Sequence, residues 1–193
     1  MSGTASLALM GVKGGPAIYP GSHMPTSMLL KLADQTVLID AGLGVTRGIC
    51  DQGVALKNLD AIFVTHLHSD HYLELGPLLH TAWVGGLNRP VPIYGPSGLL
   101  DYWHGFLKSM AFDIELRIKD EGRCELAPLF DFRCLKPGDV PSSSRLTISA
   151  MLNDHPPIEE SFALRFEANN KAVTLSGDTA FMPEMIRFAA DSD

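Results

Sequence analysis

The stretch Thr65-His66-Leu67-His68-Ser69-Asp70-His71 gathers three imidazoles and a carboxylate within six positions. It directly follows residues 59–64, an apolar run rich in β-branched and aromatic side chains, which is typical of a buried strand. His66 and His68 are two positions apart, so in an extended chain their side chains point to the same side and can share one cation. The stretch therefore predicts a metal-binding loop at the end of a strand, with Asp70 and His71 turned towards a second metal position.

Composition is that of one well-packed domain spanning residues 1–193, because 46% of the residues are hydrophobic and 19% are charged. Fifteen basic and twenty-two acidic side chains give a formal charge of −7, which repels polyanions at long range. This charge argues against non-specific nucleic-acid binding, although a local basic patch would override it.

The three cysteines are widely spaced and match no CxxC pattern, which argues against a disulfide framework or a cysteine zinc site. A reducing, cytoplasmic location is the expectation that fits this cysteine usage. No apolar stretch approaches the roughly 20 residues that a membrane span needs. We therefore expect a soluble protein without a membrane partner.

Strand and helix patterns alternate along the rest of the chain. Strands are expected at residues 6–12, 26–32, 36–39, 91–94, 146–152, 161–166 and 172–175, and helices at 45–55, 72–84 and 99–110. The mixed-sign stretch 117–136 is interpreted as a solvated face. Arg117 and Arg123 are kept as weaker candidates for gripping an anionic group, because guanidinium forks suit sulfate and phosphate.

The spacing His66-x-His68-x-Asp70-His71 after a strand resembles the signature of the metallo-β-lactamase superfamily. Residues 38–44 (LIDAGLG), 94–98 (YGPSG) and 176–179 (SGDT) resemble its ribonuclease Z and arylsulfatase-like members. The resemblance covers nearly the whole chain. It implies an α/β (α+β) fold, a four-layer αββα sandwich with the metals at one edge.

The resemblance also implies roles for individual residues. His155, at the end of the strand 146–152, becomes the third imidazole on the first metal beside His66 and His68. Asp70 and His71 serve the second metal, and Asp178 bridges the two. The expected cofactor is zinc, two ions per subunit, with manganese or iron as alternatives. Asp40 either hydrogen-bonds a metal-bound histidine or is a plain turn aspartate.

One ligand of the family pattern has no match. The pattern places a further histidine on the second metal near the end of a longer chain, whereas the last histidine here is His155. We therefore expect this sequence to lack a C-terminal portion. The second metal is expected to be the more weakly held.

The expected function is metal-dependent hydrolysis of an ester bond, most simply a small sulfate or phosphate ester, by a metal-bound hydroxide. Asp70 is the expected catalytic residue, because it would orient or deprotonate the attacking water. One alternative is a ribonuclease Z-like endonuclease that processes tRNA 3′ ends, and another is a non-catalytic scaffold or binding protein. The charge of −7 and the lack of a visible tRNA-gripping arm favour a small anionic ester over nucleic acid as the partner. A homodimer is a possible assembly.

Overall fold

The computed structural model describes residues 5–142 and 145–193 and contains two β-sheets. The first sheet has strands in chain order: β1 (Ser6–Gly11), β2 (Ser27–Leu32), β3 (Gln35–Ile39), β4 (Ala61–Phe63), β5 (Val91–Gly95) and β6 (Phe130–Cys134). Its first three strands are antiparallel, and β3 to β6 are parallel. The second sheet is antiparallel, in the order β10 (Lys171–Leu175), β9 (Phe162–Ala168), β8 (Thr147–Leu152) and β7 (Gly138–Asp139).

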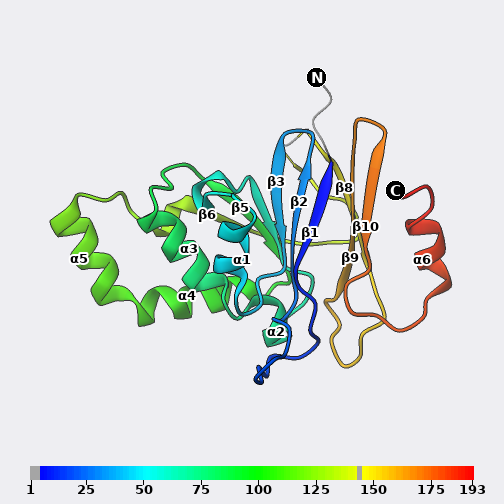
Figure 1. Ribbon diagram of the computed structural model, residues 1–193, viewed down its shortest axis with the longest axis horizontal. Coiled ribbons are helices and arrows are strands. Elements are labelled where there is room, and N and C mark those ends of the chain that lie inside the picture. Colours follow the sequence, from blue (N-terminus) through cyan, green and yellow to red (C-terminus); the bar gives the residue numbers. More distant parts are fainter. Residues whose placement is uncertain (1–4, 143–144) are drawn as a thin grey trace.

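Helices cover the outer faces of the two sheets. They are α1 (Val45–Asp51), α2 (Ser69–Tyr72), α3 (Leu75–Val84), α4 (Leu99–Ser109), α5 (Ala111–Glu121) and α6 (Pro183–Phe188). Figure 1 shows α1, α3, α4 and α5 on the outer side of the first sheet and α6 beyond the second. The four-layer αββα arrangement predicted from the sequence is therefore confirmed.

Two apolar clusters fill the spaces between these layers. One joins the first sheet to the helices, and Trp83 is its largest fully buried side chain. The other lies between the two sheets, where Phe63 of β4 stacks on Tyr94 with ring centroids 4.6 Å apart. Phe63 also meets Phe166 of the second sheet edge to face at 5.1 Å. This packing fixes the end of β4, from which the histidine-rich loop departs.

Two tight turns set the register of the hairpins expected from the sequence. Ala33 and Asp34 join β2 to β3 with φ of 50° and 61°, and Asn169 and Asn170 join β9 to β10 with φ of 53° and 58°. Consecutive left-handed residues match the twist of a two-residue hairpin turn, and asparagine and aspartate tolerate that conformation well. Both predicted hairpins are confirmed.

Stretch 117–136 contains more regular structure than the sequence indicated, because it includes the end of α5 and all of β6. Arg117 pairs with Asp113 and Glu121 on its own helix. Arg123 pairs with Glu121, and its guanidinium lies 5.5 Å from the ring centroid of Trp83. Both arginines are thus paired within the helical layer, and their weaker assignment to an anionic group gains no support from these contacts.

No helix in the described part of the chain is long and apolar enough to cross a bilayer.

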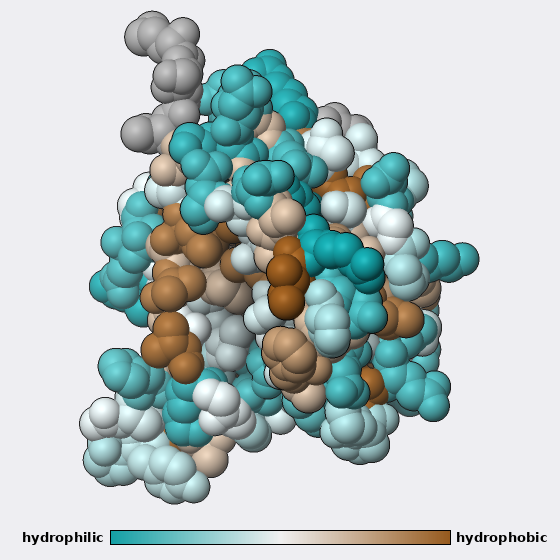
Figure 2. Space-filling model, turned by 90° about the vertical axis from the view of Figure 1, so that its right-hand side faces the viewer, coloured by the Kyte–Doolittle hydropathy of each residue, from teal (hydrophilic) through white to brown (hydrophobic). Residues whose placement is uncertain are grey.

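Figure 2 shows the face that carries α6, where apolar side chains gather beside a hollow. Large apolar residues that are exposed on β1 and near α6 are Leu7, Leu9, Phe181 and Ile186.

Candidate metal centre

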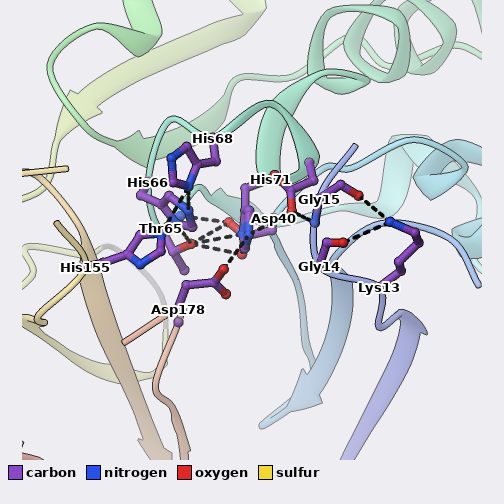
Figure 3. A network of polar contacts seen from close by, with 12 residues as sticks. Lys13, Gly14, Gly15, Asp40, Thr65, His66, His68, His71, His155 and Asp178 are labelled. Atoms are coloured by element: carbon purple, nitrogen blue, oxygen red, sulfur yellow. Dashed lines mark hydrogen bonds and ion pairs between the residues drawn. The ribbon is translucent and has the colours of Figure 1, made fainter. Parts of the chain in front are cut away.

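Three loops from two sheets meet at one end of the sandwich, below the ends of β3 and β4 in Figure 1. The loop after β4 carries His66 and His68 and continues into α2 with Asp70 and His71. The loops after β8 and β10 carry His155 and Asp178. Figure 3 shows these side chains turned towards one another.

The first group of ligand atoms consists of three imidazole nitrogens. His68 Nδ1 lies 3.1 Å from His66 Nε2 and 3.0 Å from His155 Nε2, and all three atoms fall within 4.8 Å of one another. A neutral imidazole has one N–H donor and one acceptor nitrogen. Three rings that converge through single nitrogens supply the donor set that zinc accepts.

The second group surrounds His71. Its Nε2 atom lies 3.6 Å from Asp178 Oδ2 and 3.7 Å from Asp70 Oδ2. It is buried and has no hydrogen-bond partner among residues 5–142 and 145–193. Two ligand atoms that bind one tetrahedral zinc at ~2.1 Å lie roughly 3.4 Å apart, close to the separations seen here. A metal ion would therefore satisfy this orphaned nitrogen, and the residues present fit the metal that the resemblance implies.

The two groups are neighbours. His66 and His71 have ring centroids 4.0 Å apart, and His66, His71 and Asp178 offer ligand atoms within 4.8 Å of one another. Asp70 reaches His71 but belongs to neither set of mutually close ligand atoms. His66 is common to both sets, so Asp178 lies beside the ring that joins the two groups.

Asp40 orients the ring of His71 through a hydrogen bond to the nitrogen that faces away from the second group. It is fully buried, and its Oδ2 lies 2.8 Å from His71 Nδ1. Its Oδ1 accepts a hydrogen bond from the backbone N–H of Thr65 at 2.7 Å. An ionised carboxylate only accepts, so Nδ1 of His71 carries the proton and Nε2 keeps its lone pair towards the metal position. Of the two roles open from the sequence, Asp40 takes the hydrogen-bonding one.

Electrostatics shift the pKa values of His66 and His71 in opposite directions. Burial lowers the pKa of His66 to about 3, and the nearby charges of His71, His155 and His68 act in the same direction. For His71, burial opposes the charge, but the hydrogen bond and charge of Asp40, with help from Asp178 and Asp70, raise its pKa. Burial raises the pKa of Asp40 despite its partners. The His66 ring therefore stays neutral across the physiological range.

Gly177 brings Asp178 close to the centre. Its φ is 60°, and a Cβ atom there would lie 2.8 Å from the carbonyl oxygen of Phe162. Only glycine adopts this conformation without strain at such a close approach. The backbone that precedes Asp178 can therefore pack closely against the chain at Phe162.

Several contacts near the centre carry no signal in the sequence. Thr65 Oγ1 hydrogen-bonds both oxygens of Asp40 and lies 3.1 Å from His66 Nδ1. Glu74 accepts hydrogen bonds from the backbone N–H of Gly44 and of Thr46, which ties the start of α1 to the α2–α3 junction. The partners of Asp40 and Glu74 lie at least 25 positions away in the chain, so only the folded arrangement reveals these contacts.

All six residues predicted as metal ligands lie together at this end of the molecule, namely His66, His68, Asp70, His71, His155 and Asp178. Their assignment as ligands stays a prediction, because convergence alone does not establish metal binding. His80, in contrast, hydrogen-bonds Asp113 at 2.9 Å between α3 and α5.

Comparison with known proteins agrees with this arrangement. Residues 5–193 match the family model described as "Anti-Pycsar protein Apyc1". Ribonuclease Z of Mycobacterium bovis (strain BCG / Pasteur 1173P2) is 32% identical over 190 residues, which cover 97% of this chain and 67% of the relative. The chain thus spans about two thirds of that relative's length.

Solved structures show the same fold. The metallo-β-lactamase fold protein YhfI from Bacillus subtilis superposes with a TM-score of 0.72 at 22% identity, over 97% of this chain and 68% of that one. The short form of human tRNase Z gives a TM-score of 0.73 at 17% identity, over 97% of this chain and 75% of that one. The chain therefore belongs to the family described as "Anti-Pycsar protein Apyc1", within the ribonuclease Z branch of the metallo-β-lactamase superfamily of metal-dependent, ester-cleaving hydrolases.

Proposed function

We propose that this protein hydrolyses a phosphodiester bond with the help of two adjacent metal ions. The observation that carries the proposal is the pairing of a three-histidine group with a histidine–carboxylate group whose inner nitrogen, His71 Nε2, is buried and unsatisfied. A three-imidazole set beside a carboxylate-rich set is suited to two neighbouring divalent cations. When bound, such metals act as Lewis acids and lower the pKa of water.

Each side chain has a distinct part in this proposal. His66, His68 and His155 would hold one ion, and Asp70 and His71 the other, with Asp178 between them. Zinc is the proposed ion, two per subunit, with manganese or iron as alternatives. Asp40 keeps Nε2 of His71 free for the metal, because its carboxylate accepts a hydrogen bond from the proton-bearing Nδ1.

Asp70 is the proposed catalytic residue. It is buried, and its Oδ2 accepts a hydrogen bond from the backbone N–H of Gly15 at 2.5 Å while lying 3.7 Å from His71 Nε2. A carboxylate fixed in this way can orient a water molecule or take its proton beside the second metal position.

The relatives named above support the ribonuclease Z-like alternative better than the sulfate ester first expected from the sequence, because ribonucleases cleave phosphodiesters. A precursor tRNA is therefore the second candidate substrate, beside small phosphodiesters. The formal charge of −7 argues for the small substrate, since a polyanion would be repelled at long range. Sulfate esters are the least favoured of the three candidate substrates.

A substrate panel tests the proposal. The protein loaded with zinc or manganese is assayed with bis(p-nitrophenyl) phosphate, cyclic and open phosphodiesters, p-nitrophenyl sulfate and a precursor tRNA. We expect turnover of phosphodiesters that His155→Gln removes and that the exposed-helix control His104→Gln preserves. Equal turnover by both variants, or turnover of the sulfate alone, would contradict it.

A further inference from the structure

The loop between β1 and β2 reaches the metal centre from the other end of the chain. Within it, the Gly15 N–H donates to Asp70 Oδ2 across 55 positions of sequence. The base of the loop is closed by the N–H groups of Val12 and Lys13, which both donate to the Met24 carbonyl at 3.0 Å. Asp70 thus takes a hydrogen bond from a segment that contributes none of the six predicted ligands.

The Lys13 ammonium group hydrogen-bonds this loop on the side that faces away from the metal centre. Its Nζ atom donates to the carbonyl oxygens of Gly14 at 2.9 Å and of Gly15 at 3.2 Å. Figure 3 shows the ammonium group on one side of the Gly14–Gly15 segment and the metal centre on the other. None of the ion pairs found among residues 5–142 and 145–193 involves Lys13, so these two carbonyls are its described partners.

Peptide geometry links the two sets of contacts. The Gly14 carbonyl and the Gly15 N–H belong to one peptide unit, and in a trans peptide these groups point in opposite directions. An ammonium group that holds the carbonyl on one side therefore aims the N–H to the other side, towards Asp70. Hydrogen bonds in such a chain also polarise and strengthen one another.

Glycine is required at this point for its backbone angle. Gly15 has a φ of 80°, which is left-handed, and a Cβ atom there would meet only the Lys13 Nζ atom, at 3.9 Å. Space is therefore available, and conformation is what restricts the position.

We propose that Lys13 is a positioning residue for Asp70: it acts through the Gly14–Gly15 peptide and fixes the carboxylate beside the second metal position. This inference rests on the proposed function, because it assumes that Asp70 and His71 serve a second metal. The oxygen held by Gly15 is the one that lies 3.7 Å from His71 Nε2. Loss of the ammonium group frees the peptide to turn and lets Asp70 leave that position.

The test compares Lys13→Met, which keeps chain length without charge, with Lys13→Arg, whose donors can still reach two carbonyls. Lys108→Met, an exposed change on α4, is the control. Zinc affinity is measured by titration against a competing chelator, resolved into a tight and a weak site. We expect Lys13→Met to weaken the second site about 10- to 100-fold and to leave the first unchanged. Lys13→Arg restores most of the affinity, and Lys108→Met has no effect.

A second readout uses the metal-free protein. Hydrogen exchange of the Gly15 amide, followed by NMR, should be slow in the parent protein and faster in both Lys13→Met and Asp70→Asn. Unchanged exchange and unchanged second-site affinity in Lys13→Met would overturn the proposal, as would an equal loss at both metal sites. If the parent protein binds no second metal, the proposed function fails, and the Gly15 exchange still decides whether Lys13 holds the peptide against Asp70.

Discussion

Replacement of Asp40 by asparagine gives a sharp prediction, because it changes one atom of a side chain that is not among the six predicted metal ligands. Asp40 is fully buried and has a φ of 60°, a conformation that asparagine also tolerates. The asparagine carbonyl can keep the hydrogen bond from the Thr65 N–H, now 2.7 Å from Oδ1. The fold should therefore survive the substitution.

The effect falls on His71. An amide NH₂ group facing His71 Nδ1 demands an acceptor there, so the ring proton moves to Nε2, the nitrogen that faces Asp70 and Asp178. A protonated Nε2 cannot bind a metal. Loss of an outer hydrogen-bond partner typically costs 10- to 100-fold in metal affinity, or about 1.4–2.7 kcal/mol, and the wrong tautomer places this case at the upper end.

Chelator competition on Asp40→Asn and on the exposed control Asp101→Asn measures this effect directly. We expect a weaker second site and a nearly unchanged first site in Asp40→Asn. The melting temperature of the metal-free variant should equal or exceed that of the parent, because burial raises the pKa of Asp40 and a neutral amide avoids that cost. Parental affinity at both sites would refute the tautomer argument.

Three further predictions concern the same centre. His68→Ala should remove the first metal and most hydrolytic activity while circular dichroism stays unchanged, since His68 lies on a loop at the sheet edge; unfolding would contradict this. The free energy of unfolding of the metal-free protein should fall as the pH falls from 6.5 towards 3, because His66, with its pKa lowered to about 3, takes up a proton only on unfolding in this range. Denaturant titrations should give a slope of roughly 1.4 kcal/mol per pH unit, and His66→Gln should flatten that slope. Gly177→Ala should destabilise the fold by more than the roughly 1–2 kcal/mol of its left-handed φ of 60°, because a Cβ atom there would also lie 2.8 Å from the Phe162 carbonyl oxygen. Asn169→Ala, at a φ of 53° in the hairpin turn, measures the cost of the backbone angle alone in thermal unfolding, and a Gly177→Ala variant no less stable than Asn169→Ala would contradict the clash.

The candidates that are easiest to recognise in the sequence are those that lie within a few residues of one another. The histidine-rich loop after β4 holds four of the six candidates within six consecutive positions, and their residue types and spacing are typical of a metal site. His155 and Asp178 are harder, because each is a single residue at the end of a strand. Their assignment needed the family resemblance as well as the strand pattern.

The helical layer shows a different limit. Helix α5 was not expected, and among its residues only Ile114 is buried. A helix that buries so little has a weak apolar stripe, so its charges dominate the sequence pattern and resemble a solvated loop. Ion pairs within the helix, such as those of Arg117 with Asp113 and Glu121, then stabilise a helix that the hydrophobic periodicity does not predict.

The role of Asp40 depends on strand pairing, which explains why the sequence left it open. Strands β3 and β4 are parallel, with Ile39 opposite Phe63, so the residues that follow each strand emerge side by side. The Asp40 N–H donates to the Phe63 carbonyl at 2.8 Å, and the Thr65 N–H donates back to the Asp40 carboxylate. Thr65 lies 25 positions after Asp40, and no local pattern indicates that their strands are neighbours. Once that pairing is known, the position of Asp40 beneath His71 follows, because parallel strands deliver their carboxyl ends to the same edge of the sheet.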